Sequence, residues 1–213
     1  MAYSAGTGDD DRIQGTRGED LVFGLGGDDT ILTYGPPVGG GPFAAYRARA
    51  ADRADLVLAG DGDDRVEAGG GADVVDGGAG DDIIAAGAGA DTIMGGAGDD
   101  VFVFGWLGGP FPEADTRTGR NARDVVLDFE PGGDLIDLSG YGNASAPGAV
   151  WLGTGVPAAG SQQLQVGYRV EGALTVVEFY APTGERPGRG VPRPTGEIEL
   201  VGLHQLMESD FIL

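Results

Sequence analysis

The chain has 213 residues, and its composition excludes several classes of protein. Its 43 Gly and 12 Pro make up about a quarter of the residues, roughly twice the usual share, which excludes a helical bundle. The 34 acidic residues outnumber the 13 basic residues, all Arg, and the formal charge is −21. Nucleic acid and anionic membrane surfaces are therefore unsuitable partners. Without Cys the chain has neither disulfides nor thiolate metal sites, so hard cations bound by oxygen are the expected partners.

The N-terminal residues lack the basic and apolar regions of a secretory signal peptide. No run of eighteen apolar residues occurs anywhere, so we expect no membrane span. We also expect no export by the common N-terminal route. The start at Met1, shortly before the first repeat at Gly6, favours a standalone protein.

A nine-residue repeat runs through the first half of the chain. The unit reads G-G-x-G-x-D-x-U-x, where U is apolar, and is clearest in residues 77–85 and 95–103. Three units span residues 6–32 and six span 50–103, separated by an out-of-frame insert at 33–49. The sixth position is Asp in every unit: Asp11, Asp20, Asp29, Asp55, Asp64, Asp73, Asp82, Asp91 and Asp100. The eighth is always apolar: Ile13, Val22, Ile31, Val57, Val66, Val75, Ile84, Ile93 and Phe102.

The two halves of the unit predict a turn followed by a short strand. Gly adopts positive φ values in tight turns, and the x-U-x segment suits a strand of three residues. Two units make one coil, and stacked coils place the U side chains in one column between two parallel sheets. We therefore expect an all-β fold, a right-handed parallel β-roll of about four and a half coils and roughly 20 Å in length.

One apolar residue per unit is a thin core, so we expect bound ions to stabilise the roll. The sixth-position carboxylates and the Gly carbonyls of the turns offer the oxygen cage that Ca²⁺ prefers, whereas Mg²⁺ requires a tighter octahedron. We expect about five or more Ca²⁺ ions between units n and n+2. The expected pairs are Asp11 with Asp29, Asp55 with Asp73, Asp64 with Asp82, Asp73 with Asp91 and Asp82 with Asp100. The expected Gly ligands are Gly62, Gly71, Gly78, Gly80, Gly87, Gly89, Gly96 and Gly98.

Residues 1–103 contain 18 Asp, 2 Glu and 6 Arg, a net charge of −14. A metal-free roll repels itself, so we expect an unfolded or molten chain that folds cooperatively when calcium binds. The competing interpretation is that the Asp-Gly pairs mark hairpin turns of an antiparallel protein. Hairpins need longer strands and no fixed nine-residue phase, which argues against it.

The units resemble the repeats-in-toxin (RTX) family of calcium-binding proteins. That resemblance implies a parallel β-roll, export of the unfolded chain by a type I transporter of a Gram-negative cell, and folding in external calcium. Asp9 stands where the first unit should have Gly, and the unit at 50–58 lacks all its Gly residues. The expected calcium sites are least supported at these two units.

From residue 104 the repeat disappears and larger apolar side chains become frequent, which predicts a β-rich C-terminal cap over 104–213 after a roll over 1–103. Residues 161–170 and 172–180 read as two strands joined by a turn at Glu171 and Gly172. Residues 186–194 read as an exposed loop, followed by a last strand at 197–201.

Three C-terminal stretches, at 124–139, 198–202 and 210–213, resemble the C-terminal domain of serralysin-type secreted metalloproteases. The resemblance implies that Asp128, Asp134 and Asp137 cap the roll and contribute calcium ligands. The alternative is that these acids cap turns in solvent. It also implies that Asp210, Phe211, Ile212 and Leu213 belong to an uncleaved secretion signal.

The sequence contains no recognisable catalytic motif. H-E-x-x-H, G-x-S-x-G and a Walker loop are all missing, and the single His, His204, fits a surface or cap position better than a triad. Carboxylate pairs suited to glycoside chemistry stay open because 34 acids provide many such pairs. We expect no enzyme activity.

The favoured function is an extracellular or cell-surface calcium-binding module that partners with calcium and a type I transporter. The alternative is a calcium-dependent polysaccharide-binding or adhesive module, since alginate epimerases carry comparable RTX modules. Its candidate contacts are exposed aromatic and Arg side chains of the insert, which suit sugar rings and carboxylates: Tyr34, Phe43, Tyr46, Arg47 and Arg49. The insert also reads as a plain loop between two coils.

Overall fold

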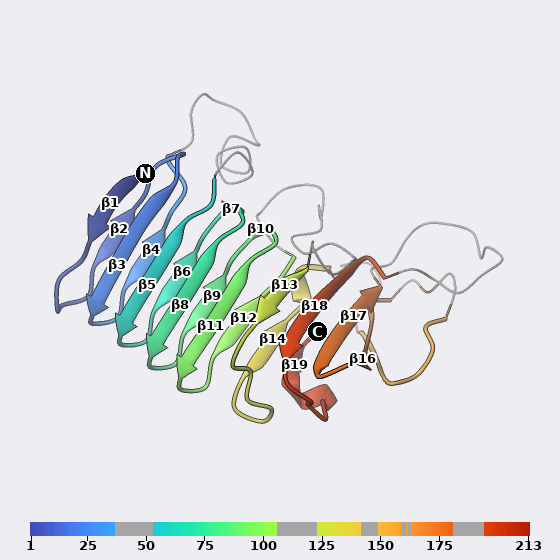
Figure 1. The fold of residues 1–213 in the computed structure, drawn as a ribbon. Coiled ribbons are helices and arrows are strands. Elements are labelled where there is room, and N and C mark those ends of the chain that lie inside the picture. Colours follow the sequence, from blue (N-terminus) through green and yellow to red (C-terminus); the bar gives the residue numbers. More distant parts are fainter. Residues whose placement is uncertain (37–52, 106–122, 142–148, 159–160, 162, 181–193) are drawn as a thin grey trace.

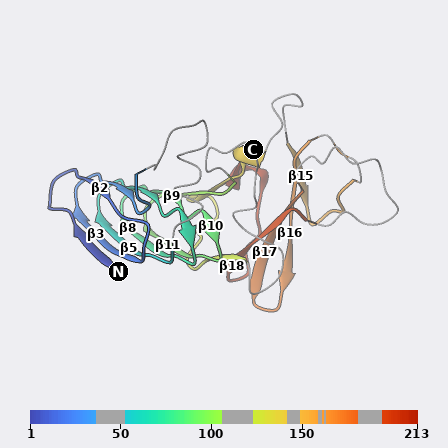
Figure 2. The ribbon, with the colours of Figure 1, turned by 90° about the horizontal axis from the view of Figure 1, so that it is seen from above.

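A computed structural model describes residues 1–36, 53–105, 123–141, 149–158, 161, 163–180 and 194–213. The described strands form two stacked layers that run along the length of the molecule (Figures 1 and 2). We call them the long sheet, with ten described strands, and the short sheet, with seven.

The long sheet has the order β1-β3-β5-β8-β11-β13-β18-β17-β16-β15. Its strands are β1 (Ala2–Ala5), β3 (Asp20–Gly26), β5 (Leu56–Asp61), β8 (Val74–Ala79), β11 (Thr92–Ala97), β13 (Asp124–Val126), β18 (Gly196–Val201), β17 (Leu174–Tyr180), β16 (Gln165–Glu171) and β15 (Val150–Gly153).

The short sheet has the order β19-β14-β12-β9-β6-β4-β2. Its strands are β19 (Phe211–Ile212), β14 (Leu135–Asp137), β12 (Val101–Val103), β9 (Ile83–Ala85), β6 (Arg65–Glu67), β4 (Thr30–Leu32) and β2 (Arg12–Gln14). Two-residue strands β7 (Gly70–Gly71) and β10 (Ala88–Gly89) pair within the turns, and short 3-10 helices cover Ser139–Tyr141 and Glu208–Asp210.

The chain alternates between the two sheets, and every pairing along the roll is parallel. In the long sheet Val57 lies beside Val75, and Val75 beside Ile93; in the short sheet Val66 lies beside Ile84. All nine eighth-position side chains are buried in one continuous core. The fold expected from the repeat, a parallel β-roll, is therefore confirmed.

Strand length differs from the expectation in one of the two sheets. The repeat strands β2, β4, β6, β9 and β12 of the short sheet have three residues each, as expected. In the long sheet β3, β5, β8 and β11 have six or seven, because pairing continues into the Gly-rich turn, where Gly60 lies beside Gly78. Gly78 has φ +111°, and a side chain there would overlap the Gly60 carbonyl. Gly thus allows the turns, as well as the strands, to stack closely.

Both sheets extend beyond the repeat recognised in the sequence. At the N-terminal end, β1 adds a strand beside β3 and places Ser4 opposite Val22. At the other end β13 and β14 stack on β11 and β12, followed by β18 and β19. The division of the chain after residue 103 stays a prediction, and the strands of both sheets continue across it.

The C-terminal hairpin and the last expected strand are present. Strands β16 and β17 pair antiparallel with Glu171 opposite Leu174, so the turn is formed by Gly172 and Ala173, one residue later than expected. Strand β18 pairs antiparallel with β17 and parallel with β13, which joins the hairpin to the roll. No helix in the described part of the chain has the length and hydrophobicity needed to cross a membrane.

Candidate metal sites

The turns of the roll lie along two edges that differ in composition. Turns 6–11, 24–29, 59–64, 77–82 and 95–100 lead from the long sheet to the short sheet, and we call this the acidic edge. Connections 15–20, 33–55, 68–73, 86–91 and 104–123 lead back to the long sheet, and we call this the insert edge. Each edge carries its own row of sixth-position Asp residues.

On both edges the sixth-position Asp residues form an inner ladder, in which the Oδ1 of one Asp accepts the backbone N–H of the Asp one coil earlier. On the acidic edge the ladder runs Asp11, Asp29, Asp64, Asp82, Asp100 and Asp134, with distances of 2.7–3.0 Å. On the insert edge it runs Asp20, Asp55, Asp73, Asp91 and Asp124, at 2.7–2.9 Å. All five pairs expected from the sequence are adjacent in these ladders.

The ladders leave buried carboxylate oxygens without hydrogen bonds. The Oδ2 atoms of Asp29, Asp55, Asp64 and Asp82 have no hydrogen-bond partner, and these residues are at most 4% exposed. A buried charged oxygen without a partner is strongly unfavourable. These atoms therefore indicate places where a cation fits.

Backbone carbonyls approach the same oxygens. A Cβ on Gly77 would overlap both the Asp82 Oδ2 and the Gly95 carbonyl of the next coil, and a Cβ on Gly24 would overlap the Asp29 Oδ2 and the Ala59 carbonyl. No three acidic or His side chains converge on one point within the described residues, so most ligands must be carbonyls. A mixed cage of carboxylate and carbonyl oxygens suits Ca²⁺.

Burial changes the acidity of the ladder. Desolvation raises the pKa of Asp82 to about 7 and the pKa values of Asp64 and Asp100 to about 6. Desolvation also raises the pKa values of Asp29, Asp55 and Asp134. Nearby carboxylates add to the rise at all six; for Asp134 they are Asp128 and Glu130 of its own turn. Without a cation, these acids are therefore reluctant to ionise.

The N-terminal ends of both ladders are closed by threonine. The Oδ2 of Asp11 accepts hydrogen bonds from the backbone N–H and the hydroxyl of Thr7, at 2.6 and 2.8 Å. In Asp20 the Oδ2 accepts the backbone N–H of Thr16 at 2.6 Å, and the Oδ1 accepts the Thr16 hydroxyl at 3.0 Å. Thr stands at the second position of these two units, where the five units from residue 59 onward have Gly. The first coil therefore satisfies its carboxylates from within the protein, unlike the coils that follow.

The acids after the repeat occupy three different environments. Asp134 continues the acidic-edge ladder, and its second oxygen accepts the Glu130 N–H at 2.8 Å. Asp128 accepts the backbone N–H groups of Gly95 and Gly96 at 3.0 Å. Asp137 accepts the N–H of Ser139, two residues later, at 2.8 Å. Of the three, Asp137 has the geometry of a local turn cap, while Asp134 lies in line with the expected ligands.

Sequence reasoning did not select Asp124 as a ladder residue. It is fully buried and closes the insert-edge ladder beside Asp91. The sequence pattern that could have identified Asp124 is the D-x-U triplet Asp124-Val125-Val126, which lacks the preceding Gly residues. Val126, at the U position, is buried in the core. Asp134-Leu135-Ile136 repeats the same triplet.

The Gly residues expected as carbonyl ligands lie in the stacked turns. Most have positive φ values: Gly62, Gly71, Gly78, Gly80, Gly87, Gly96 and Gly98, whereas Gly89 is not among them. Their part in binding an ion stays a prediction.

A second ladder lies on the acidic edge only. The fifth-position residues Asp10, Asp28, Asp63, Asp81 and Asp99 are exposed, and each carboxylate accepts the N–H of the next one at 2.8–3.0 Å. This outer ladder runs in the opposite sense to the inner one, because here the carboxylate belongs to the earlier coil.

Other residues selected from the sequence lie elsewhere. Tyr34 was expected to be exposed, and this is wrong: it is 7% exposed, and its hydroxyl donates to Glu67 at 2.7 Å. The other insert candidates, Phe43, Tyr46, Arg47 and Arg49, lie outside the described residues. His204 packs edge-on against Phe129, with ring centroids 6.0 Å apart.

The four terminal residues expected to form a secretion signal belong to the folded cap. Asp210 and Phe211 are buried, and strand β19, Phe211–Ile212, pairs with β14. The Oδ2 of Asp210 accepts the N–H of Met207 at 2.7 Å. Leu213 packs against the core.

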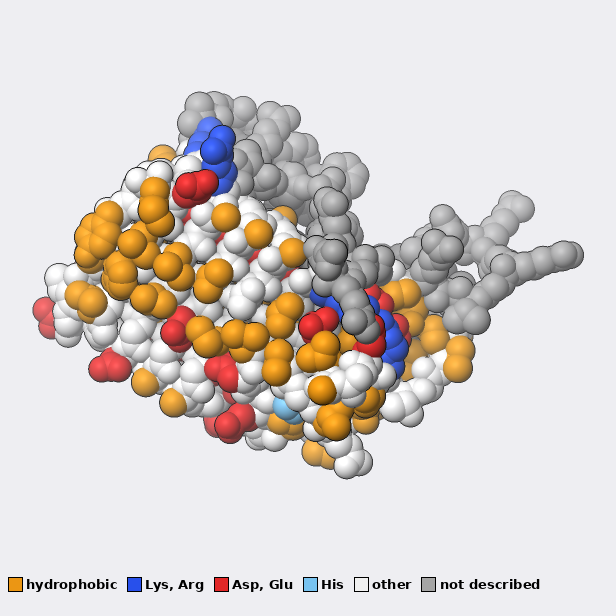
Figure 3. All heavy atoms as spheres, viewed as in Figure 1, with side chains coloured by type: hydrophobic (Ala, Val, Ile, Leu, Met, Phe, Trp, Pro, Cys, Tyr) orange, Lys and Arg blue, Asp and Glu red, His pale blue; other side chains and the backbone are white. Residues whose placement is uncertain are grey.

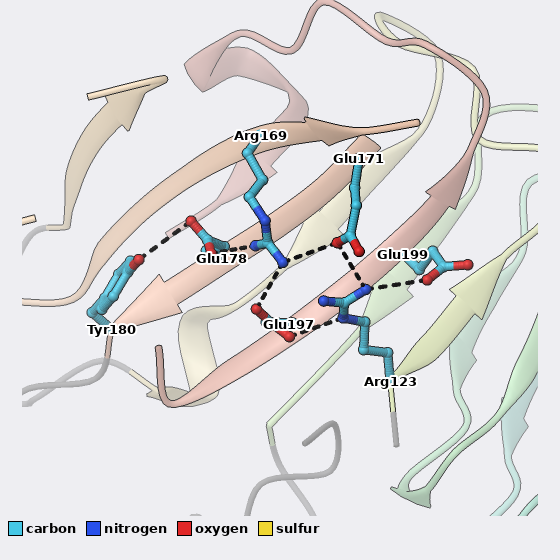
Figure 4. A network of polar contacts seen from close by, with 7 residues as sticks. All are labelled: Arg123, Arg169, Glu171, Glu178, Tyr180, Glu197 and Glu199. Atoms are coloured by element: carbon cyan, nitrogen blue, oxygen red, sulfur yellow. Dashed lines mark hydrogen bonds and ion pairs between the residues drawn. The ribbon is translucent and has the colours of Figure 1, made fainter. Parts of the chain in front are cut away.

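An ion-pair network fastens the hairpin to the roll (Figure 4). Buried Arg123, which precedes Asp124, donates to Glu197 at 2.8 Å and lies 3.3 Å from Glu171 and 3.4 Å from Glu199. Arg169 pairs with Glu171, Glu178 and Glu197. The network spans β16, β17 and β18 from the last connection of the insert edge.

Comparison with known proteins identifies the repeat. Residues 5–34, 50–84 and 76–106 match the family described as RTX calcium-binding nonapeptide repeat (4 copies). No curated protein matches the chain significantly.

Two similar solved structures are the AlgE6R3 and AlgE6R2 subunits of the mannuronan C5-epimerase from Azotobacter vinelandii. The first is 25% identical with a TM-score of 0.34, covering 97% of this chain and 80% of that one. The second is 24% identical with a TM-score of 0.35, covering 98% and 91%. The family match itself covers residues 5–34 and 50–106, which is less than half of the chain.

Proposed function

We propose that this chain is an extracellular calcium-binding module that folds when it meets external calcium. The observation that carries the proposal is the row of buried carboxylates with unpartnered oxygens, Asp29, Asp64 and Asp82 on one edge and Asp55 on the other. Several negative charges stacked one coil apart in the protein interior need cations between them. Five ions would bring the formal charge from −21 to about −11.

Folding and ion binding are coupled in this proposal. Each gap takes its carboxylates from two coils, for example Asp64 and Asp82, so no complete site exists in an unfolded chain. The free energy of binding then contributes directly to the free energy of folding. A chain inside a calcium-poor cell stays unfolded, and the same chain outside folds.

Export through a type I transporter is the second part of the proposal. The expected signal, Asp210 to Leu213, lies in and beside strand β19 of the folded cap. A transporter could reach these residues only before the chain folds. This supports export of an unfolded chain, with calcium preventing its return.

The proposal assigns no catalytic role to the chain. The alternative, a polysaccharide-binding module built on the insert, retains Phe43, Tyr46, Arg47 and Arg49 as candidates. Tyr34 is no longer among them because it is buried.

The test is a calcium titration of chelator-treated protein, followed by circular dichroism and calorimetry, with magnesium as the matched control. We expect little β signal in chelator, cooperative recovery with calcium, and no recovery with magnesium at the same concentration. Recovery of the chelator-treated chain with magnesium would refute the assignment of calcium. A β signal unchanged by chelator would refute the coupling of folding to metal.

A further inference from the structure

The outer face of the long sheet carries an apolar patch that the roll itself does not require. Its six side chains lie on three adjacent strands, and we call it the apolar patch: Tyr3 on β1, Leu21, Phe23 and Leu25 on β3, and Leu56 and Leu58 on β5. They alternate with the buried side chains of the same strands and therefore point away from the core.

The register makes the patch continuous. Tyr3 lies beside Leu21, and Leu21 beside Leu56. Phe23 lies beside Leu58, and its ring centroid is 5.7 Å from that of Tyr3. Figure 3 shows hydrophobic side chains gathered over β1, β3 and β5. On the next strand, β8, Val74 lies beside Leu56 and is 39% exposed, whereas Asp76, beside Leu58, brings the first charge.

The opposite outer face of the same coils has a different character. Strands β2 and β6 of the short sheet direct Arg12, Arg65 and Glu67 outward. The repeat therefore accepts charged side chains at outward positions. The lack of charge in the patch, within a chain of formal charge −21, is a local property of one sheet face.

Leu25 adds an independent observation. It is the only non-Gly residue with positive φ in the described parts of the chain, at +89°. The positions beside it in the following coils are Gly60, Gly78 and Gly96, with φ of 126°, 111° and 106°. A branched side chain in this conformation is strained, yet Leu25 is 55% exposed. Little of this side chain is buried within the chain to offset the strain.

We propose that the apolar patch is the contact surface of a symmetric dimer, in which two copies pack long sheet against long sheet. A polyanion is excluded by the charge of the chain, and a cationic partner finds no charge in the patch. A second copy offers a sheet face of the same shape and polarity, and sheets pack face to face at about 10 Å. Self-repulsion of two acidic chains is smallest where both faces lack charge.

The size of the face sets the expected affinity. The patch covers three strands about 4.8 Å apart and roughly six residues long, which gives on the order of 300 Å² per copy. About 600 Å² in total is below the usual range of specific complexes, which indicates a weak dimer. We expect a dissociation constant of about 100 µM.

Sedimentation velocity of the calcium-loaded full chain from about 1 to 200 µM tests the proposal. We expect a concentration-dependent shift from monomer to dimer. Leu25→Gly should raise the dissociation constant about tenfold and also raise the thermal midpoint of the dilute monomer, because Gly relieves the strained φ. This combination distinguishes a docking residue from a residue that stabilises its own chain.

The matched control is Leu203→Gly, which removes an exposed leucine outside the patch, 68% exposed, and should leave dimerisation unchanged. Tyr3→Ser should weaken the dimer as Leu25→Gly does. A wild-type chain that stays monomeric at 200 µM overturns the proposal. So does a dimer that is unaffected by both patch substitutions, or a lowered thermal midpoint in Leu25→Gly. Circular dichroism of each sample separates a failure to fold in calcium from a failure to dimerise.

Discussion

The two edges of the roll carry the same inner ladder but different residues beside it. On the acidic edge the fifth position is Asp in all five repeat turns, whereas on the insert edge it is Glu19, Ala54, Ala72 and Ala90, followed by Arg123. The inner hydrogen bonds have the same length on both edges, 2.7–3.0 Å. The sixth position therefore determines the roll, and the fifth is free to take other roles.

The connections differ between the edges in a related way. Along the acidic edge each step between the repeat coils is bridged twice, by the inner and the outer ladder. The insert edge has no outer carboxylate ladder among the described residues, although β7 and β10 pair between two of its turns. The long connections at 33–55 and 104–123 belong to this edge. The long connections thus lie on the edge that lacks the outer carboxylate ladder.

Removing one inner carboxylate on the acidic edge should give the largest effect. Asp82 borders two gaps, toward Asp64 and toward Asp100. Asp82→Asn keeps the shape and should lose both ions, about 5 kcal/mol when calcium is a hundredfold above its dissociation constant. In chelator at pH 8 the same substitution should instead favour folding, because it removes a buried charge whose pKa is raised to about 7. Thermal unfolding in calcium and in chelator measures both effects.

The control for that comparison is the neighbouring outer acid. Asp81→Asn keeps an oxygen that can accept the N–H of Asp99 and removes only an exposed charge, so it should change stability by less than about 0.5 kcal/mol in either condition. Equal effects of the two substitutions would contradict the distinction between inner and outer ladders.

Substitution of Arg123 tests whether the fifth position of the insert edge holds the hairpin through its ion pairs. Arg123→Ala removes the nearest cation from buried Glu197, at 2.8 Å, and leaves it only Arg169 at 3.1 Å among its printed ion pairs; it should destabilise the chain by about 3 kcal/mol. Arg123→Lys should recover only part of this, because Lys lacks the guanidinium fork. Calcium-loaded thermal unfolding is the measurement, and Asp99→Asn, at the fifth position of the other edge, is the control. An Arg123→Ala chain as stable as wild type would show that the network does not hold the hairpin.

The stability of the metal-free chain should change with pH in the opposite sense to ordinary acid denaturation. This effect should be smaller than that of Arg123→Ala. The folded pKa values of about 7 for Asp82 and about 6 for Asp64 and Asp100 lie above the ordinary aspartate value of 3.8. The folded state therefore binds more protons, and its stability rises as the pH falls from above 7 toward 4. Circular dichroism in chelator between pH 8 and 5 should show β structure increasing. A loss of structure over that range would contradict the raised pKa values.

The threonine closures of the first coil should give the smallest effect. Thr16→Val removes the hydroxyl that donates to Asp20 and should lower stability by about 1 kcal/mol. The midpoint of the calcium titration should change little, since no ion is needed at a carboxylate closed from within. Thr7→Val is the counterpart on the acidic edge, where the site is exposed and the effect should be smaller. A large shift in calcium midpoint would indicate that Asp11 and Asp20 bind ions after all.

The repeat region could be predicted well because all nine units carry Asp at the sixth position and an apolar residue at the eighth. Gly marks positions where stacked turns approach closely, and a fixed nine-residue phase determines both which Asp residues meet and which apolar residues are buried. The same reasoning predicted the hairpin β16–β17 and strand β18 from alternating apolar residues bounded by Gly. All of these signals are local in the sequence.

The missed features depend on contacts that the local sequence does not encode. Strand β1 has Ser4 at the core position, and its pairing with β3 is determined by the neighbouring coil. Asp124 follows Asp91 by 33 residues instead of 18, so the nine-residue frame does not reach it. Asp134, 34 residues after Asp100, was selected from the family resemblance and not from the frame. Tyr34 was misplaced because an aromatic residue in an insert reads as exposed, whereas its first residues, Thr33 and Tyr34, still belong to the packed coil.

The ladder crosses the first insertion without any change of spacing. Asp55 binds the N–H of Asp20 at 2.7 Å across 35 residues of sequence, the same distance found between Asp55 and Asp73 across 18. The spacing between these coils is therefore independent of the length of the connection that joins them. For protein engineering, this edge is a natural grafting point: a foreign loop or a small domain whose ends can meet between Pro36 and Arg53 should be carried without altering the pitch of the roll.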